Sequence, residues 1–255
     1  MIGAGDAVVA FGKEAQALLA VLGRSLRMTF RMRFSDFVDQ LGRVALSALP
    51  LVCIAALFAG MVIALNSSVQ LTKYGQPELV ADVVSVSLVT ELAPVFTALL
   101  MSGKAGAGLA SELGMVVLSG QAQAMRALSL DIDRELIAPR VWACVIGTML
   151  LTIAAALFGL MGGMVLGSAK LGISPIHYMN RATFALDPIH FVLCIVKSIG
   201  FGVIIAAFGT RMGLRDKVDA GALGQHTMSA VVIASFVVLI ADHVMTTFIY
   251  AVLGP

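Results

Sequence analysis

Residues Val44–Leu65 read VALSALPLVCIAALFAGMVIAL and contain no charged side chain. A helix needs roughly 20 consecutive apolar residues to cross the hydrocarbon core of a bilayer. Inside lipid the backbone must satisfy its own hydrogen bonds, so an apolar run of this length predicts a membrane-spanning helix.

Four further stretches have the same length and character, at about 83–101, 141–167, 191–208 and 230–253. The second of these four is uncharged, and the others hold one charge each: Glu91, Lys197 and Asp242. In the whole chain 59% of residues are hydrophobic and only 13% are charged, whereas about a quarter are charged in an ordinary soluble domain. The sequence therefore predicts an all-α integral membrane protein with five spans.

The N-terminal segment, residues 1–40, has a different pattern. Its apolar residues Phe11, Leu18 and Leu22 recur at helical spacing, and its arginines, among them Arg24 and Arg27, lie on the opposite face. An apolar stripe backed by cations is typical of a helix in the membrane interface, although a solvated cytoplasmic helix is the alternative. We predict one membrane domain over 1–255, with an interfacial helix at 1–40 and a five-span core at 41–255.

Lysine and arginine are distributed unevenly among the connections. The segment before the first span and the loops after the second and fourth spans hold most of them, whereas the other side has Lys73, Lys170 and Arg181. Cytoplasmic loops carry the excess of Lys and Arg. The N-terminus is therefore expected in the cytoplasm and the C-terminus on the opposite side, five crossings later.

Two connections show helical signals. Pro175 and Pro188, between the third and fourth spans, are plausible first residues of helices. The loop Gly103–Arg140 is long and partly apolar, and its pattern predicts an amphipathic helix followed by a short helical turn near Asp131–Asp133. Such a loop is either a docking surface for another protein or a helix that lies on its own membrane.

Three ionisable residues fall inside predicted spans. Each costs about 2.5–3.5 kcal/mol on insertion scales, so such groups normally face the protein interior and pair. Lys197 could form an ion pair with Asp242 or with Glu91. These residues either line or gate a substrate path or stabilise helix packing, and Pro94 is expected to loosen the backbone close to Glu91.

Signals for catalysis or for tightly bound metal are missing. The sequence has no His-Glu-x-x-His zinc motif and no Gly-x-Ser-x-Gly elbow, and neither Gly-Lys pair is followed by the Ser or Thr that a phosphate loop requires. We therefore expect no catalytic residue, no metal site and no cofactor bound by this chain. A formal net charge of +2 gives no indication of nucleic-acid binding.

The stretch Glu91–Ala107, ELAPVFTALLMSGKAGA, resembles the signature of the MlaE/YrbE permease family, and Ala110–Met115 is similar to a motif that follows it in that family. Further motifs recur in order, so the resemblance covers nearly all of the chain beyond about residue 35. Two departures are Thr90, where the family usually has arginine, and Gly120, where it usually has glutamate.

The resemblance implies the permease subunit of an ABC transporter that moves phospholipid or related lipid between membranes. It implies a homodimer in the bacterial inner membrane, with a periplasmic C-terminus. The expected partners are an ATPase subunit that holds ATP and Mg²⁺, an MCE-domain substrate-binding protein and a small cytoplasmic STAS-domain subunit.

The resemblance also implies two sets of site residues. Substrate binding or gating would involve Glu91, Lys197, Asp242, Met61, Leu65 and Val69. A cytoplasmic coupling helix between spans two and three would contact the ATPase through Lys104, Glu112, Met115, Gln121, Met125 and Arg126. The alternatives are an ion-coupled secondary carrier, with Glu91 and Asp242 as proton sites, and a non-transporting scaffold for a lipid-binding protein.

Overall fold

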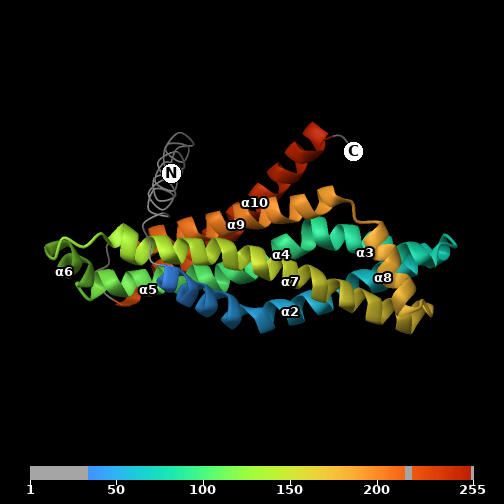
Figure 1. Ribbon diagram of the computed structural model, residues 1–255, viewed down its shortest axis with the longest axis horizontal. Coiled ribbons are helices and arrows are strands. Elements are labelled where there is room, and N and C mark those ends of the chain that lie inside the picture. Colours follow the sequence, from blue (N-terminus) through green and yellow to red (C-terminus); the bar gives the residue numbers. More distant parts are fainter. Residues whose placement is uncertain (1–33, 216–219, 254–255) are drawn as a thin grey trace, which may run out of the picture. The chain divides into compact units, whose positions relative to one another are not determined.

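The computed structural model describes residues 34–215 and 220–253, and every regular element within these ranges is helical (Figure 1). The long elements are α2 (Phe34–Lys73), α7 (Ala138–Leu171), α9 (Pro188–Leu214) and α10 (Ala220–Leu253). The shorter α-helices are α3 (Val80–Ser87), α4 (Ala93–Met101), α5 (Ala107–Leu118), α6 (Gln121–Ala127) and α8 (Pro175–Phe184). A 3₁₀ turn, η2 (Pro77–Leu79), and three π-helical segments, η3 (Leu88–Leu92), η4 (Ser102–Gly106) and η5 (Asp133–Ile137), complete the set.

In the described part of the chain, five helical stretches are long and apolar enough to cross a membrane: Phe34–Lys73, Pro77–Leu118, Asp133–Leu171, Pro188–Leu214 and Gly221–Ala251. Each overlaps one of the runs predicted from sequence, so the five-span prediction is confirmed. The second span is a composite in which α3, η3, α4, η4 and α5 follow one another without a break.

Most of the predicted N-terminal interfacial helix, residues 1–33, lies outside the described residues. Residues 34–40 form the first turns of α2, so no helix boundary falls at residue 40.

The connections follow the turn signals of the sequence. Gly75 and Gly120 adopt positive φ, at 72° and 75°, which glycine tolerates without steric cost. Gly75 ends the turn after α2, and Gly120 separates α5 from α6. Pro175 and Pro188 are the first residues of α8 and α9, which confirms both as helix starts.

The described chain divides into two compact units, and the first comprises residues 34–44, 101–145, 203–215 and 220–237. Ala110, Met212 and Ala230 form a buried cluster in it. Glycines of α9 allow a close approach to η4 and α5, since a Cβ at Gly209 would lie 2.9 Å from the Gly106 carbonyl oxygen and one at Gly213 would lie 2.8 Å from the Leu113 Cβ. This packing fixes the last turns of α9 against the start of α5.

The second unit comprises residues 45–100, 146–202 and 238–253. Here α2 and α7 touch through their backbones, because a Cβ at Gly60 would meet the Gly159 carbonyl oxygen and one at Gly162 would lie 2.1 Å from that of Leu57. Glycines at these positions of the third span therefore permit the close helix approach. The prediction of a single domain over 1–255 stays a prediction.

Candidate functional site

Lys197 lies at the centre of a polar cluster in the second unit. Its side chain is 1% exposed, and the ammonium Nζ donates hydrogen bonds to Glu91 Oε2 at 2.6 Å and Thr246 Oγ1 at 2.7 Å. Asp242 Oδ1 lies 2.9 Å from the same nitrogen. That last contact has ion-pair distance without hydrogen-bond geometry, so Asp242 is held chiefly by charge.

Thr246 is a member of the cluster that the sequence analysis missed. Its hydroxyl accepts from Lys197 and lies 3.2 Å from Glu91 Oε1, to which it donates. Thr246 follows Asp242 by one helical turn on α10, and residues four apart share a helix face. That spacing was the signal that could have identified it.

The backbone that carries Glu91 is a π-helical segment, η3. Pro94 is the second residue of α4, the helix that directly follows η3. Proline has no backbone N–H, so it cannot donate a hydrogen bond to the preceding turn. The expected loosening of the helix near Glu91 is therefore present. Single π-helical turns occur often at functional sites, and here the turn carries the carboxylate that accepts from Lys197.

The cluster joins three spans through one ammonium and two carboxylates. In a medium of low dielectric, removing one partner of a buried charge pair costs about 3–5 kcal/mol, because the other charge is left uncompensated. α10 has the smallest buried share of the five spans. The contacts of Asp242 and Thr246 with Lys197 therefore hold α10 against α9 where apolar packing is sparse. A change in the cluster would loosen α10 directly.

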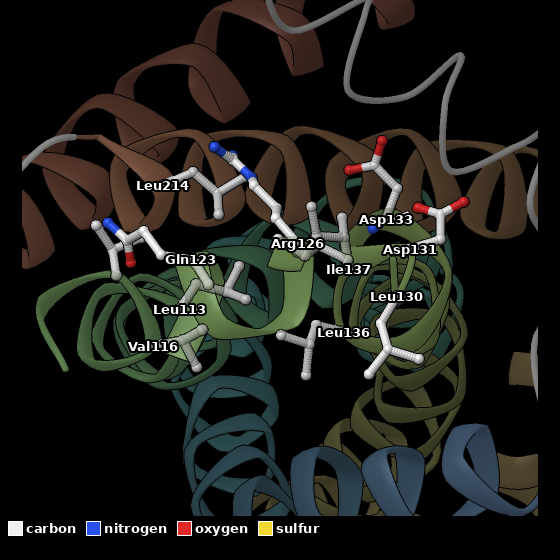
Figure 2. A pocket seen from close by; sticks show the side chains of 13 residues that line it. Leu113, Val116, Gln123, Arg126, Leu130, Asp131, Asp133, Leu136, Ile137 and Leu214 are labelled. Carbon is white, nitrogen blue, oxygen red and sulfur yellow. Dashed lines mark hydrogen bonds between the residues drawn. The ribbon is translucent and has the colours of Figure 1, made fainter. Parts of the chain in front are cut away.

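A second candidate site lies in the first unit, where α5, α6, η5 and the end of α9 enclose a cavity of about 400 Å³ (Figure 2). Apolar side chains line much of it, among them Leu113, Val116, Leu136, Ile137 and Leu214. Figure 2 shows Arg126 extending toward Leu214 on one side, with the carboxylates of Asp131 and Asp133 on the other. The site offers an apolar floor between groups of opposite charge.

The residues expected to contact an ATPase fall in several places. Arg126 alone among them lines this cavity. Glu112 accepts a hydrogen bond from Arg140 Nε at 3.0 Å, which ties α5 to the start of α7. Of the remaining four, Lys104 in η4, Met115 in α5 and Gln121 at the start of α6 are exposed, and Met125 in α6 is half-buried.

The three apolar residues expected to contact lipid lie on α2. Met61 is half-buried, whereas Leu65 and Val69 are exposed. They lie at intervals of four residues, so they share one face of the helix. On the same helix Phe58 and Val62 are also exposed. An exposed apolar face on a spanning helix is compatible with contact to lipid or to another helix.

No group of three or more His, Cys, Asp and Glu side chains that could hold a metal ion occurs among the described residues. The three cysteines, Cys53, Cys144 and Cys194, are buried thiols without a disulfide. Buried free cysteines of this kind pack as small apolar side chains.

Comparison with known proteins gives one family. Residues 37–248 match the family model described as Permease MlaE. A probable ABC transporter permease protein of Rickettsia bellii is 32% identical over 219 residues, which cover 86% of this chain and 85% of that protein.

Two further relatives come from other groups of organisms. The intermembrane phospholipid transport system permease protein MlaE of Haemophilus influenzae is 28% identical over 256 residues, covering 95% of this chain and 97% of that protein. The chloroplastic protein TRIGALACTOSYLDIACYLGLYCEROL 1 of Arabidopsis thaliana is 30% identical over 220 residues, covering 86% of this chain and 63% of that protein.

Proposed function

Because this chain belongs to the MlaE permease family of ABC transporter membrane subunits, we propose that it moves phospholipid or a related lipid between two membranes. The family match carries the proposal, since residues 37–248 reach into all five spans. The relative from Haemophilus influenzae is named for intermembrane phospholipid transport, and we extend that substrate class to this chain.

The energy would come from ATP bound by a separate ATPase subunit, because the sequence has no phosphate loop. We assign ATPase docking to the cavity between α5, α6 and η5, whose apolar floor can take an apolar side chain of the partner. Arg126 on one side and Asp131 on the other would orient that partner by charge. A small cytoplasmic STAS-domain subunit is a further partner that we propose for the complex.

The working unit is a homodimer in the bacterial inner membrane, with the N-terminus in the cytoplasm and the C-terminus in the periplasm. The excess of lysine and arginine in the connections after the second and fourth spans supports this orientation. Two copies would enclose an apolar hollow, and an MCE-domain protein on the periplasmic side would receive or deliver the lipid. The exposed apolar faces of α2 and α10 supply surface for such a hollow.

Acyl chains would pack on α2 near Met61, Leu65 and Val69. The cluster of Lys197, Glu91 and Asp242 would gate this path, because it fixes α10 to two other spans by polar contacts that a conformational change can break. ATP binding to the partner would bring the two copies together and transfer lipid to or from the MCE protein.

Reconstitution of the complete complex in liposomes tests the proposal. We expect ATP-dependent transfer of a fluorescent phospholipid, and co-purification of the ATPase and the MCE protein in mild detergent. Glu91→Ala and Lys197→Ala should each abolish transfer while the partners still co-purify. Lys170→Ala is the matched control, because Lys170 is an exposed lysine at the end of α7.

Three results would contradict parts of this assignment. Normal transfer by both charge variants would remove the gating role. Transport by the isolated chain without an ATPase would favour an ion-coupled carrier. Harmless charge variants, together with loss of assembly on deletion of the loop between α5 and α7, would favour a scaffold.

A further inference from the structure

The short helix α8 is attached firmly on one face. The side chain of Tyr178 packs against α7, where a Cβ at Gly163 would lie 2.5 Å from its phenol oxygen and one at Gly167 would lie 3.0 Å from its ring. Arg181 Nη2 and Nε donate to the two carboxylate oxygens of Asp82 on α3, at 2.5 and 3.2 Å, and this hydrogen bonding raises the pKa of Arg181. Packing and a two-point charge contact therefore fix which face of α8 points outward.

The outward face carries two large apolar side chains. Ile176 is 74% exposed and Phe184 is 90% exposed, at opposite ends of α8. Polar residues lie between them, and the hydroxyl of Thr183 donates to the backbone carbonyls of Met179 and Asn180. The two basic side chains of α8, His177 and Arg181, face carboxylates of η2 and α3.

The chain on either side holds α8 close to the ends of two spans. Residues 172–174 join it to α7, and residues 185–187 join it to α9. Three extended residues reach at most about 10 Å. α8 therefore cannot extend far into the aqueous phase, and Figure 1 shows it running across the end of α7 rather than along it.

The contacts of Tyr178 place α8 at a definite level along α7. At about 1.5 Å per residue, Gly167 and Gly163 lie about 6 and 12 Å before the last residue of α7, Leu171. The predicted apolar run of this span also ends at Gly167. α8 is thus beside the final turns of the span, where the predicted apolar run ends.

From this placement we propose that the outward face of α8 binds the boundary between the head groups and the acyl chains of the surrounding lipid, with Phe184 and Ile176 inserted as apolar anchors. Helices of this kind bury their apolar residues about 5–10 Å into that boundary. The polar residues between the anchors lie level with the head groups. This assignment concerns the lipid around the protein, and it does not depend on the transported substrate.

Tryptophan fluorescence in nanodiscs tests the assignment with the full chain. The chain has one tryptophan, Trp142, so Phe184→Trp in a Trp142→Phe background gives a single reporter. We expect emission to fall by about half in discs of phosphatidylcholine brominated near the glycerol end of its acyl chains, and less when the bromines lie near the methyl end. Ile153→Trp on α7, an exposed residue near the middle of its span, should give the reverse order.

A water-soluble quencher, acrylamide, separates the other outcomes. Strong quenching by acrylamide with none by brominated lipid would show that Phe184 faces water and would overturn the proposal. Quenching by neither would show that a protein surface covers α8 and would overturn it as well. Ile176→Trp provides a second reporter at the other end of the helix, so a poorly folded Phe184 variant does not end the test.

Discussion

Lys197 on α9 donates a 2.6 Å hydrogen bond to Glu91 in the π-helical turn of the second span, although more than a hundred residues separate them in sequence. The ammonium also donates a hydrogen bond to Thr246 and forms an ion pair with Asp242, both on α10. One buried cation therefore connects three spans, and its neighbours are open to substitution one at a time.

Thr246→Val tests the part of this cluster that carries no charge. Valine has nearly the shape of threonine but cannot accept from Lys197 or donate to Glu91. A hydrogen bond to a charged group contributes about 1.5–3 kcal/mol, so we expect a lower thermal midpoint of the purified chain and slower lipid transfer by the complex.

The neighbouring Thr247→Val is the control for this variant. Thr247 is exposed, and its hydroxyl donates only to the His243 carbonyl of its own helix. It should leave both measurements within error. Equal effects from the two substitutions would mean that the Thr246 contacts contribute nothing specific.

Ala122→Trp tests the docking cavity of the first unit. Ala122 lies on α6 and lines the cavity, so an indole ring there would fill the space assigned to a side chain of the ATPase. We expect binding of the ATPase subunit to weaken by about 2 kcal/mol or more, the scale of a central interface residue. Binding would be measured by titration of the ATPase onto the chain in nanodiscs.

Ala124→Trp on the same helix is the matched control, because Ala124 is exposed and is not a lining residue of the cavity. Arg126→Glu reverses the charge of one rim residue without filling the cavity, and it should also weaken binding. Unchanged affinity in both Ala122→Trp and Arg126→Glu would move the docking site elsewhere.

The sequence predicted the spans because each is a long apolar run, and a bilayer imposes that length on every crossing helix. It also predicted the starts of α8 and α9 from Pro175 and Pro188. It singled out the three intramembrane charges, since their insertion is costly, and the structure brings all three together.

Other features depend on contacts between distant segments. Leu214 ends the fourth span, yet it lines the cavity formed by the loop after the second span. Sequence periodicity carries no information about such a contact between distant segments. The π-helical turns also have no distinct periodic pattern in the sequence. Pro94 marked one of them, but no comparable signal was recognised for η4 or η5.

Tyr178→Phe should leave stability unchanged or raise it. The phenol is fully buried, burial raises its pKa, and within the described residues its oxygen has no hydrogen-bond partner. A buried polar group without a partner costs about 1–3 kcal/mol, and phenylalanine keeps the ring that packs on α7. The readout is the thermal midpoint, and Tyr74→Phe at an exposed tyrosine should have no effect. A clear loss of stability in Tyr178→Phe would instead indicate that a buried water binds the hydroxyl.

Gly60→Ala should lower the stability of the second unit, although it adds only one methyl group. The new Cβ would overlap the Gly159 carbonyl on α7, and the nearest atoms are backbone rather than a flexible side chain. The two helices would have to separate, and overpacking of this kind costs typically about 1–3 kcal/mol. Gly42→Ala is the control on the same helix, because a Cβ there has no neighbour within 4 Å. Alanine favours a helix over glycine by about 1 kcal/mol, so Gly42→Ala should keep or raise the thermal midpoint while Gly60→Ala lowers it. Equal midpoints for the two variants would mean that α2 and α7 are not in backbone contact.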